Sequence, residues 1–191
     1  MTVARGRKRD ETSRQAILSA TFALLEEQGF DRLSIEGVAA RAGTAKTTIY
    51  RWWPSKGVLA VEAFLATTEP LIAFPDSESP REDIMRQMRS LAALYRGPTG
   101  RFVREMIGAA QHDAAMSTAF VSGFLEPRRA QAKAVFHRGV AAGEFRADLD
   151  ADIAIDALYA PIYYRLLASG GAIDDAFVIG HAELVLRGLQ P

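Results

Sequence analysis

The sequence contains no cysteine and only three histidines among its 191 residues. Without cysteine the chain can form no disulfide, no thiolate metal site and no cysteine nucleophile, which fits a reducing compartment. It has no apolar run of about 18 residues that could cross a membrane, and no apolar segment follows its basic N-terminus as in a signal peptide. We therefore expect a soluble, cytoplasmic protein.

Motifs of catalytic and nucleotide-binding sites are also missing. The sequence has no GxGxxG segment, no P-loop and no set of nucleophile, base and acid. The pair His112-Asp113 suggests a metal ligand or a base, but a lone histidine beside one aspartate at a helix boundary is more often a cap or a surface feature. We expect no enzyme activity, metal or cofactor, and keep an all-α enzyme as a distant alternative.

The net charge is zero, but the charges are unevenly distributed along the chain. Residues 1–60 contain ten Lys or Arg against six Asp or Glu, whereas residues 61–191 contain thirteen against seventeen. The excess of positive charge in the first third suits a polyanion such as DNA. Unevenly charged, solvated helix faces are the alternative explanation.

Helical patterns dominate the chain and predict an all-α fold. Capping residues such as Thr12, Ser34, Ser55 and Ser79 mark helix starts, and glycines such as Gly43 mark helix ends. These signals predict about nine helices, which span Thr12–Gln28, Ser34–Ala42, Ala45–Trp52, Ser55–Thr68, Ser79–Tyr95, Thr99–Gln111, Met116–Ala142, Asp150–Ser169 and Asp174–Gly188.

One stretch, Pro70 to Pro80, has the composition of a linker, with three prolines. We expect it to join a small N-terminal domain, residues 1–60, to a larger helical domain, residues 61–191. Pro127 and Pro161 fall inside helical patterns, where each should kink its helix or mark a first turn.

Residues 34–53 have the spacing of a helix-turn-helix. In the first helix the apolar residues recur at i, i+3, i+4 and i+7, which predicts one buried face made of Ile35, Val38, Ala39 and Ala42. In the second helix only three residues have core spacing, namely Ala45, Ile49 and Trp53.

The other residues of the second helix face outward and include no acid from Thr44 to Lys56. The N-terminus of such a helix favours phosphate, and its lysine, arginine and threonine side chains can contact phosphates and base edges in the major groove. Lys56 can bind phosphate at the start of the next helix. A flexible basic arm before the first helix can add contacts to the minor groove or the DNA backbone, unless it is an ordinary disordered terminus; it carries Arg5, Arg7, Lys8 and Arg9.

This segment resembles the DNA-binding domain of the TetR/AcrR family over about residues 12–60. The resemblance rests on Ala20, Gly29-Phe30, Leu33-Ser34, Val38-Ala39, Ala42-Gly43, Thr48-Ile49-Tyr50, Trp53, Ser55-Lys56 and Leu59. It implies DNA contacts from Ser34, Lys46, Thr47, Thr48, Tyr50, Trp52 and Lys56. Two residues depart from the family pattern: Thr44 replaces an apolar residue, and Ala45 replaces a serine or threonine. Because alanine cannot cap, we expect Thr44 to cap the second helix, and we add Thr44 and Arg51 to the predicted contacts.

The two adjacent tryptophans allow both a core and a contact interpretation. We expect Trp53 to be core and Trp52 to face phosphate, with its indole N–H as donor. For Tyr50 the residues alone allow either a core position or a DNA contact, and the resemblance to the family favours the DNA contact.

Beyond Pro70, several motifs resemble a widespread C-terminal domain of the same family, namely Pro127-Arg128-Arg129, Gly143-Glu144-Phe145, Pro161-Ile162-Tyr163-Tyr164-Arg165 and Gly170-Gly171. The resemblance implies a homodimer formed by the last two helices, and we expect its interface to include Ile155, Leu158, Ile162, Leu166, Phe177 and Leu184 unless they form a monomer core. It also implies an inducer pocket. Flexible and aromatic side chains are the candidates for an apolar site, although each could be core: Met85, Met88, Phe102, Met106, Met116, Phe120, Phe124 and Tyr159.

The sequence thus predicts a sequence-specific DNA-binding regulator. We expect a repressor that a small, largely apolar ligand releases from a palindromic operator. The alternative is a similar DNA-binding protein without an inducer, acting as an activator or under control of a partner protein.

Overall fold

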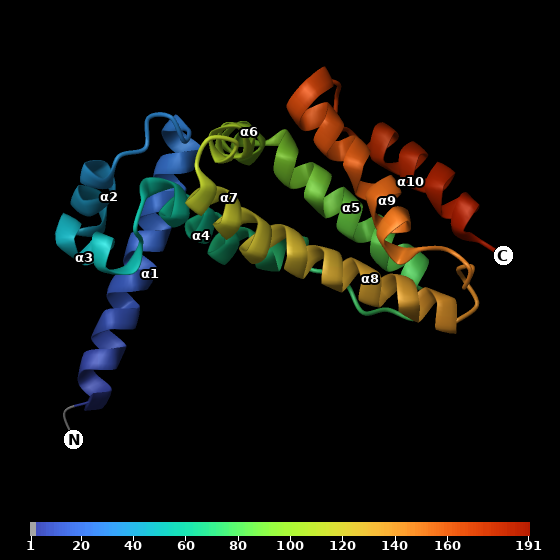
Figure 1. Cartoon of the computed structure of the whole chain (residues 1–191), viewed down its shortest axis with the longest axis horizontal. Coiled ribbons are helices and arrows are strands. Elements are labelled where there is room, and N and C mark those ends of the chain that lie inside the picture. Colours follow the sequence, from blue (N-terminus) through green and yellow to red (C-terminus); the bar gives the residue numbers. More distant parts are fainter. Residues whose placement is uncertain (1–2) are drawn as a thin grey trace. The chain divides into compact units, whose positions relative to one another are not determined.

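The structure of the chain is a computed structural model that describes residues 3–191, with side chains from Asp10 onward. The described residues form helices and no strands, so the predicted all-α fold is confirmed (Figure 1). The helices are α1 Val3–Gln28, α2 Ile35–Ala42, α3 Lys46–Trp52, α4 Lys56–Thr68, α5 Pro80–Arg96, α6 Pro98–Ala110, α7 Ala114–Phe120, α8 Glu126–Ala141, α9 Ala151–Tyr164 and α10 Asp175–Leu189.

Most helix starts lie where the capping residues predict them. The side chains of Ser34, Ser79, Asp150 and Asp174 each accept a hydrogen bond from a backbone N–H of the first turn. The first helix is the exception: α1 begins at Val3, so Thr12 lies inside the helix and not at its start. Residues 3–11 contain no proline and several good helix formers, and the helix extends through them.

Both interior prolines lie next to a turn of π-helix. The segment η2, Val121–Leu125, joins α7 to α8 without a break, and Pro127 then occupies the first turn of α8. Pro161 lies inside α9, which continues into the π-turn η3, Arg165–Ser169. Proline has no N–H to donate to the preceding turn, which favours such local changes in hydrogen-bond register.

The chain forms two compact units whose bounds differ from those of the predicted domains, residues 1–60 and 61–191, and this domain division stays a prediction. The first unit comprises Met1–Thr68 together with Arg101–Gly123, and the second comprises Glu69–Gly100 and Phe124–Pro191. The N-terminal helices thus share a unit with most of α6 and with α7, because α7 packs on α4. A pattern along the sequence does not reveal that residues 101–123 pack with the first unit after residues 69–100 have formed part of the second.

In the first unit, α1 packs against α2 and α4, and α2 packs against α3. Its core contains aromatic rings in edge-to-face contact: Phe102 of α6 lies 5.8 Å from Phe22 and 6.1 Å from Phe64, measured between ring centroids. The ring of Phe102 is completely buried. These contacts attach α6 to the N-terminal helices.

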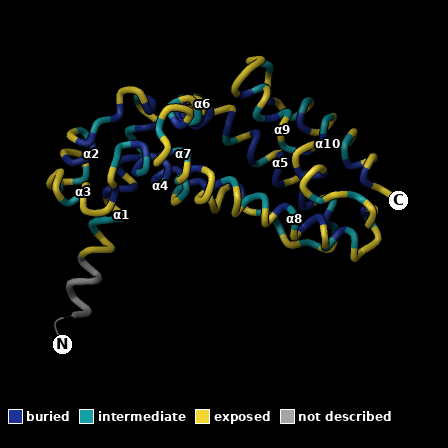
Figure 2. Tube along the Cα trace, in the orientation of Figure 1, coloured by how far each residue is buried: buried dark blue, intermediate teal, exposed yellow. Residues whose placement is uncertain are grey.

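In the second unit, α5 packs against α8 and α10, and α9 packs against α8 and α10. Buried residues alternate with exposed ones along these helices, as the tube in Figure 2 shows. Phe136 and Phe145 stack at 5.6 Å beside Gly139, where a Cβ atom would lie 2.2 Å from the Phe145 ring. A side chain at this position would therefore separate α8 from the loop that follows it.

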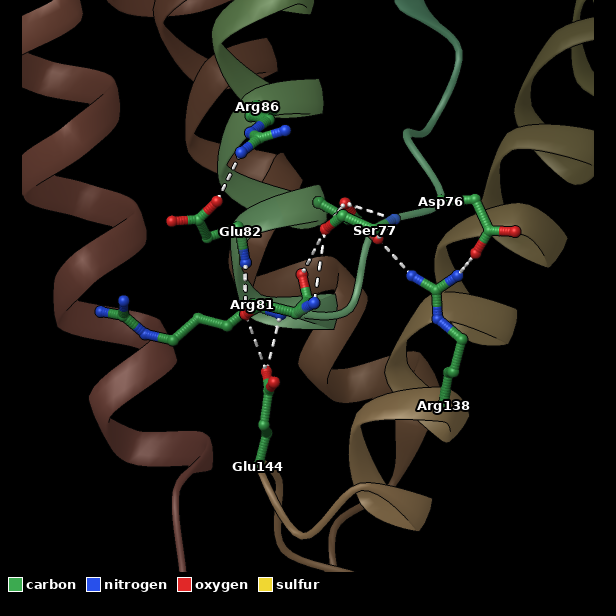
Figure 3. A network of polar contacts seen from close by, with 9 residues as sticks. Asp76, Ser77, Arg81, Glu82, Arg86, Arg138 and Glu144 are labelled. Atoms are coloured by element: carbon green, nitrogen blue, oxygen red, sulfur yellow. Dashed lines mark hydrogen bonds and ion pairs between the residues drawn. The ribbon is translucent and has the colours of Figure 1, made fainter.

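A buried aspartate holds the predicted linker against the second unit. The linker begins with the short 3-10 helix η1, Glu69–Ile72. Asp83 of α5 is fully buried and accepts hydrogen bonds from the Ser77 hydroxyl at 2.6 Å and from the Arg138 guanidinium. The same guanidinium also pairs with Asp76 (Figure 3). The backbone N–H of Arg81 donates to Glu144 at 2.9 Å. The segment thus belongs to the second unit as a fixed loop.

Within the described part of the chain, no helix is both long enough and apolar enough to cross a membrane.

Candidate nucleic-acid interface

The helix-turn-helix is built by local signals at both ends of α2. Ser34 caps its start, its Oγ accepting from the N–H of Gly37 at 3.1 Å. Gly43 ends the helix in the left-handed conformation, with φ of 63°, and the next N–H, of Thr44, donates to the carbonyl of Ala39 at 3.0 Å. Glycine adopts this conformation without a Cβ penalty. The chain therefore turns within three residues and starts α3 at Lys46.

One face of α3 is buried and the opposite face is open. Ile49 and Trp53 are buried, as predicted, whereas Ala45 is exposed and is not part of the core. It precedes the first helical residue, where its side chain no longer points along the buried stripe. The open face carries Lys46, Thr47, Tyr50, Arg51 and Trp52, with Thr48 at its border.

The cap of α3 differs from the prediction. Ala45 is the N-cap, in extended conformation and without a side-chain hydrogen bond, so Thr44 does not take over this position. Thr44 is instead half-buried, and its backbone closes the turn after α2. The first N–H groups of α3 are therefore left without a side-chain cap, which leaves them free for an anion.

The end of α3 is fixed by a buried indole. The Nε1–H of Trp53 donates to Oε2 of Glu62 on α4 at 2.6 Å, and the other carboxylate oxygen pairs with Arg14 of α1. Trp53 is 1 % exposed. This contact connects α1, α3 and α4, and sequence reasoning missed Glu62 because no local pattern links it to Trp53.

Two cations on the open face are paired with carboxylates. Lys46 lies 2.8 Å from Glu36 of α2, and Arg51 lies 3.1 Å from Asp10 of α1. The hydrogen bond from Lys46 lowers the pKa of Glu36 and raises the pKa of Lys46. All four side chains are more than half exposed, and such pairs contribute little to stability. Breaking these two pairs so that Lys46 and Arg51 can bind phosphates therefore costs little free energy.

Lys56 lies at the start of α4, half-buried beside the turn that joins α1 to α2. Its Nζ donates to the carbonyl oxygen of Phe30 at 3.3 Å and lies 4.6 Å from the centre of the Phe30 ring. No carboxylate lies within ion-pair distance of Lys56 in the part of the chain with described side chains. Its charge is therefore available to an anion.

The predicted basic arm belongs to the α1 helix from Val3 onward, so it is not a flexible segment before the first helix. The side chains of its four cations lie outside the described ones: Arg5, Arg7, Lys8 and Arg9. Their contact with DNA stays a prediction.

Comparison with known proteins supports this interpretation of residues 34–56. Residues 17–63 match the model of bacterial regulatory proteins of the tetR family, and residues 74–185 match the tetracyclin repressor-like C-terminal domain. The chain belongs to the TetR family of transcriptional regulators. The predicted function as a DNA-binding regulator with a helix-turn-helix is thereby confirmed.

Similar proteins cover the whole length of this TetR-family regulator. It is 38 % identical over 190 residues to the uncharacterized HTH-type transcriptional regulator YdeS of Bacillus subtilis, covering all of this chain and 96 % of that one. It is 32 % identical to the DNA-binding transcriptional repressor TetR of Mycobacteroides abscessus, covering 92 % and 90 %. The crystal structure of the TetR family transcription regulator SCO0332 superposes with a TM-score of 0.83 at 38 % identity, covering 94 % and 99 %.

Two more distant structures share the fold. FadR from Bacillus subtilis, in complex with stearoyl-CoA, has a TM-score of 0.71 at 15 % identity over 92 % of this chain and 99 % of that one. RolR, in complex with resorcinol, has a TM-score of 0.68 at 18 % identity over 96 % and 90 %.

The candidate ligand residues of the regulator are divided between the two units. The first unit contains Phe102, Met106, Met116 and Phe120, all buried. The second contains Met88 and Phe124, which are buried, and Met85 and Tyr159, which are partly exposed. Their role in ligand binding stays a prediction.

The second unit also holds a polar cluster that the sequence did not reveal. The hydroxyls of Tyr95 and Tyr163 lie 3.2 Å apart, and the hydroxyl of Tyr159 donates to Gln87 at 2.7 Å. Burial raises the pKa of all three tyrosines. Arg128 donates to the carbonyl of Ile72 at 2.7 Å, and burial lowers its pKa. Arg128 and Tyr163 lie in two of the motifs quoted above and Tyr159 is a ligand candidate, but the sequence does not show that they meet, because their helices are far apart in the chain.

The predicted dimer residues are mostly core of the single chain. Four of them are buried in the second unit: Ile155, Leu158, Ile162 and Leu166. Phe177 is partly covered by the guanidinium of Arg165, 3.5 Å from its ring centre, and only Leu184 is well exposed, at 73 %. Periodicity found the apolar positions of α9 and α10, but it could not tell which of two apolar faces the chain itself covers.

The pair His112-Asp113 is a capping feature. Oδ1 of Asp113 accepts from the N–H of Met116 at 3.0 Å and starts α7. Among the described residues, no group of three or more His, Cys, Asp or Glu side chains could hold a metal ion.

Proposed function

We propose that the regulator is a repressor that binds a palindromic operator as a homodimer and is released from it by a small molecule. The observation that carries the proposal is the open face of α3, where exposed cations, hydroxyls and aromatic side chains lie together. An α-helix fits the major groove, and these are the groups that contact phosphates and base edges there.

The proposed DNA contacts fall into two kinds. Lys46, Arg51, Trp52 and Lys56, with Ser34 at the start of α2, carry donors for phosphates. Thr47, Thr48 and Tyr50 carry groups for base edges and thymine methyls. Thr44 supports the turn and stays at the border of the contact surface.

An exposed apolar face on the last two helices supports the homodimer. On α9 and η3 it carries Ile153, Tyr164 and Leu167, which are 71 %, 63 % and 46 % exposed, and on α10 it carries Leu184, which is 73 % exposed. Large apolar side chains that are exposed together on one face mark an interaction site. A two-fold axis would cover this face with its own copy and bring two α3 helices to the two halves of an operator.

The polar cluster of the second unit supports control by a small molecule. The paired hydroxyls of Tyr95 and Tyr163 have two hydrogens and need only one for their mutual bond, so one O–H is left to donate. No carboxylate lies within ion-pair distance of Arg128 among the described residues, and its guanidinium donates to the carbonyls of Ile72 and Glu69. Apolar residues with a few such donors are typical of effector sites, and FadR and RolR carry stearoyl-CoA and resorcinol on the same fold.

We also propose that the regulator acts in the cytoplasm.

DNA binding is tested with a duplex selected from a random-sequence pool by the purified protein. Thr47→Ala should relax the base preference at one position of each half-site, because a contact to a base edge discriminates by about 1–3 kcal/mol. Thr118→Ala, at an exposed threonine of α7, is the control and should leave the preference unchanged. Equal preferences for Thr47→Ala and the unmodified protein would exclude Thr47 as a base contact.

Release is tested by a thermal-shift screen of small molecules followed by operator binding. A compound that raises the melting temperature should also weaken operator affinity, since it must favour a state that binds DNA less well. Equal operator affinity with and without every stabilising compound would overturn the proposed release and favour a regulator without an inducer.

A further inference from the structure

The turn between α1 and α2 is held by a carboxylate from far along the chain. Oε2 of Glu105, on α6, accepts a hydrogen bond from the backbone N–H of Phe30 at 2.5 Å. The preceding residue, Gly29, has a φ of 83°, and a Cβ atom there would lie 2.5 Å from the same oxygen. The turn requires glycine at position 29 for two reasons: glycine adopts this φ without strain, and it has no Cβ atom that would collide with Glu105.

The same residue, Phe30, holds Lys56 on its other side. Its carbonyl oxygen accepts from the ammonium of Lys56 at 3.3 Å, and its ring lies under that ammonium at 4.6 Å. Phe30 is 6 % exposed, so its ring is fixed by the core. If the backbone of Phe30 were displaced, its carbonyl oxygen and ring would no longer contact Lys56. The position of the ammonium therefore depends on where the turn holds Phe30.

Two further contacts from α6 and α7 lie near this turn without touching Phe30 or Lys56. Arg101 of α6 donates to the carbonyl of Glu26, in the last turn of α1, at 3.3 Å. On the other side of Lys56, the buried Gly57 faces Met116 of α7, where a Cβ atom would lie 2.8 Å from the sulfur. Helix α6 thus contacts the end of α1 and the turn that follows it, and α7 contacts the start of α4.

We infer that Glu105 is a positioning residue for DNA binding: it fixes Phe30, and Phe30 orients the ammonium of Lys56 toward phosphate. The inference rests on the proposed phosphate contact of Lys56. What Glu105 supplies is a hydrogen-bond acceptor, and its negative charge is not needed. A charge effect would have the opposite sign, because removing an acid near DNA raises affinity for a polyanion.

The test measures affinity for the selected operator duplex over a range of salt concentrations. Lys56→Ala should lower the slope of log affinity against log salt by about one, as loss of one phosphate contact does. Glu105→Ala should lower the slope in the same direction and weaken binding several-fold. Glu105→Gln keeps an acceptor oxygen and should restore both values.

The double variant Glu105→Ala/Lys56→Ala distinguishes positioning from a second, independent effect. It should bind no more weakly than Lys56→Ala alone, because Glu105 acts through Lys56. Arg101→Gln is the matched control: it removes the neighbouring bond between α6 and α1 without touching Phe30, and it should keep the slope of the unmodified protein. Circular dichroism at the temperature of the binding assay checks that each variant is folded, and Glu105→Asp replaces Glu105→Ala if the alanine variant is not.

Additive losses in the double variant, or a Glu105→Gln protein as weak as Glu105→Ala, would overturn the inference. If Lys56→Ala lowers the slope and Glu105→Ala does not, Glu105 has no positioning role, while the proposed DNA contact stands. If Lys56→Ala keeps the full slope, the phosphate contact is wrong and the role of Glu105 falls with it.

Discussion

The indole Nε1–H of Trp53 donates to Oε2 of Glu62 at 2.6 Å, which joins the end of the recognition helix α3 to the middle of α4. The acceptor is further held by Arg14 of α1. The orientation of α3 thus depends on a carboxylate that does not itself lie on the proposed DNA-binding face.

Glu62→Ala should lower the free energy of unfolding by about 1–3 kcal/mol, because it leaves the buried Trp53 donor without an acceptor. Urea denaturation measures the change. Glu62→Gln retains an acceptor oxygen and should recover much of the loss. Equal stability of the alanine variant and the unmodified protein would mean that water replaces the carboxylate.

Asp83→Ala should destabilise the protein by about 3 kcal/mol, because it removes the buried acceptor of Arg138 and of the Ser77 hydroxyl. Glu82→Ala is the control one residue earlier on α5; its ion pair with Arg86 is exposed and should contribute little. A denaturant series on both variants gives the two values. Similar losses would contradict the importance of burial at Asp83.

High pH should destabilise the second unit through its three clustered tyrosines, whose hydroxyls lie in the polar cluster. Burial raises the pKa of Tyr95, Tyr159 and Tyr163 above the unfolded value of about 10, because it disfavours the charged phenolate. The corresponding stability is complete below about pH 10 and is lost as pH rises above it. Thermal unfolding between pH 8 and pH 11 measures the loss, which should be smaller in Tyr95→Phe. A pH-independent melting temperature over this range would show that the tyrosines are accessible to solvent.

Glu36→Gln should strengthen operator binding roughly two- to fivefold at low salt, because it frees Lys46 from its exposed ion pair and removes a negative charge beside the DNA. Anisotropy titrations at several salt concentrations would show the difference shrinking as salt rises. Glu82→Gln, with a carboxylate of similar exposure in the second unit, should leave affinity unchanged. Weaker binding by Glu36→Gln would instead make Glu36 a direct contact.

Leu184→Glu should dissociate the proposed homodimer, since it places a charge on the exposed apolar face of α10. Light scattering after size-exclusion chromatography measures the mass of the particle. Leu71→Glu is the matched control, at an exposed leucine outside that face, and should keep the mass of the unmodified protein. An unchanged mass for Leu184→Glu would exclude this face as the interface.

The sequence alone determined the features that depend on neighbouring residues. Ser34 and Gly43 bound α2, the spacing of Ile49 and Trp53 selects the buried face of α3, and the absence of acids from Thr44 to Lys56 indicates an anionic partner. Caps, helix-breaking glycines and 3.6-residue periodicity act within a few residues, so they are legible without a structure.

Only the tertiary structure decided which distant residues meet. It brought Glu105 to Phe30 and Glu62 to Trp53, buried Ile155 and Leu158 while exposing Ile153 and Leu184, and grouped α6 and α7 with the DNA-binding helices. Helical periodicity marks an apolar position but does not say which neighbour covers it, and a single carboxylate carries no signal of its partner. These relationships depend on how the helices pack, and that packing is set by the whole chain.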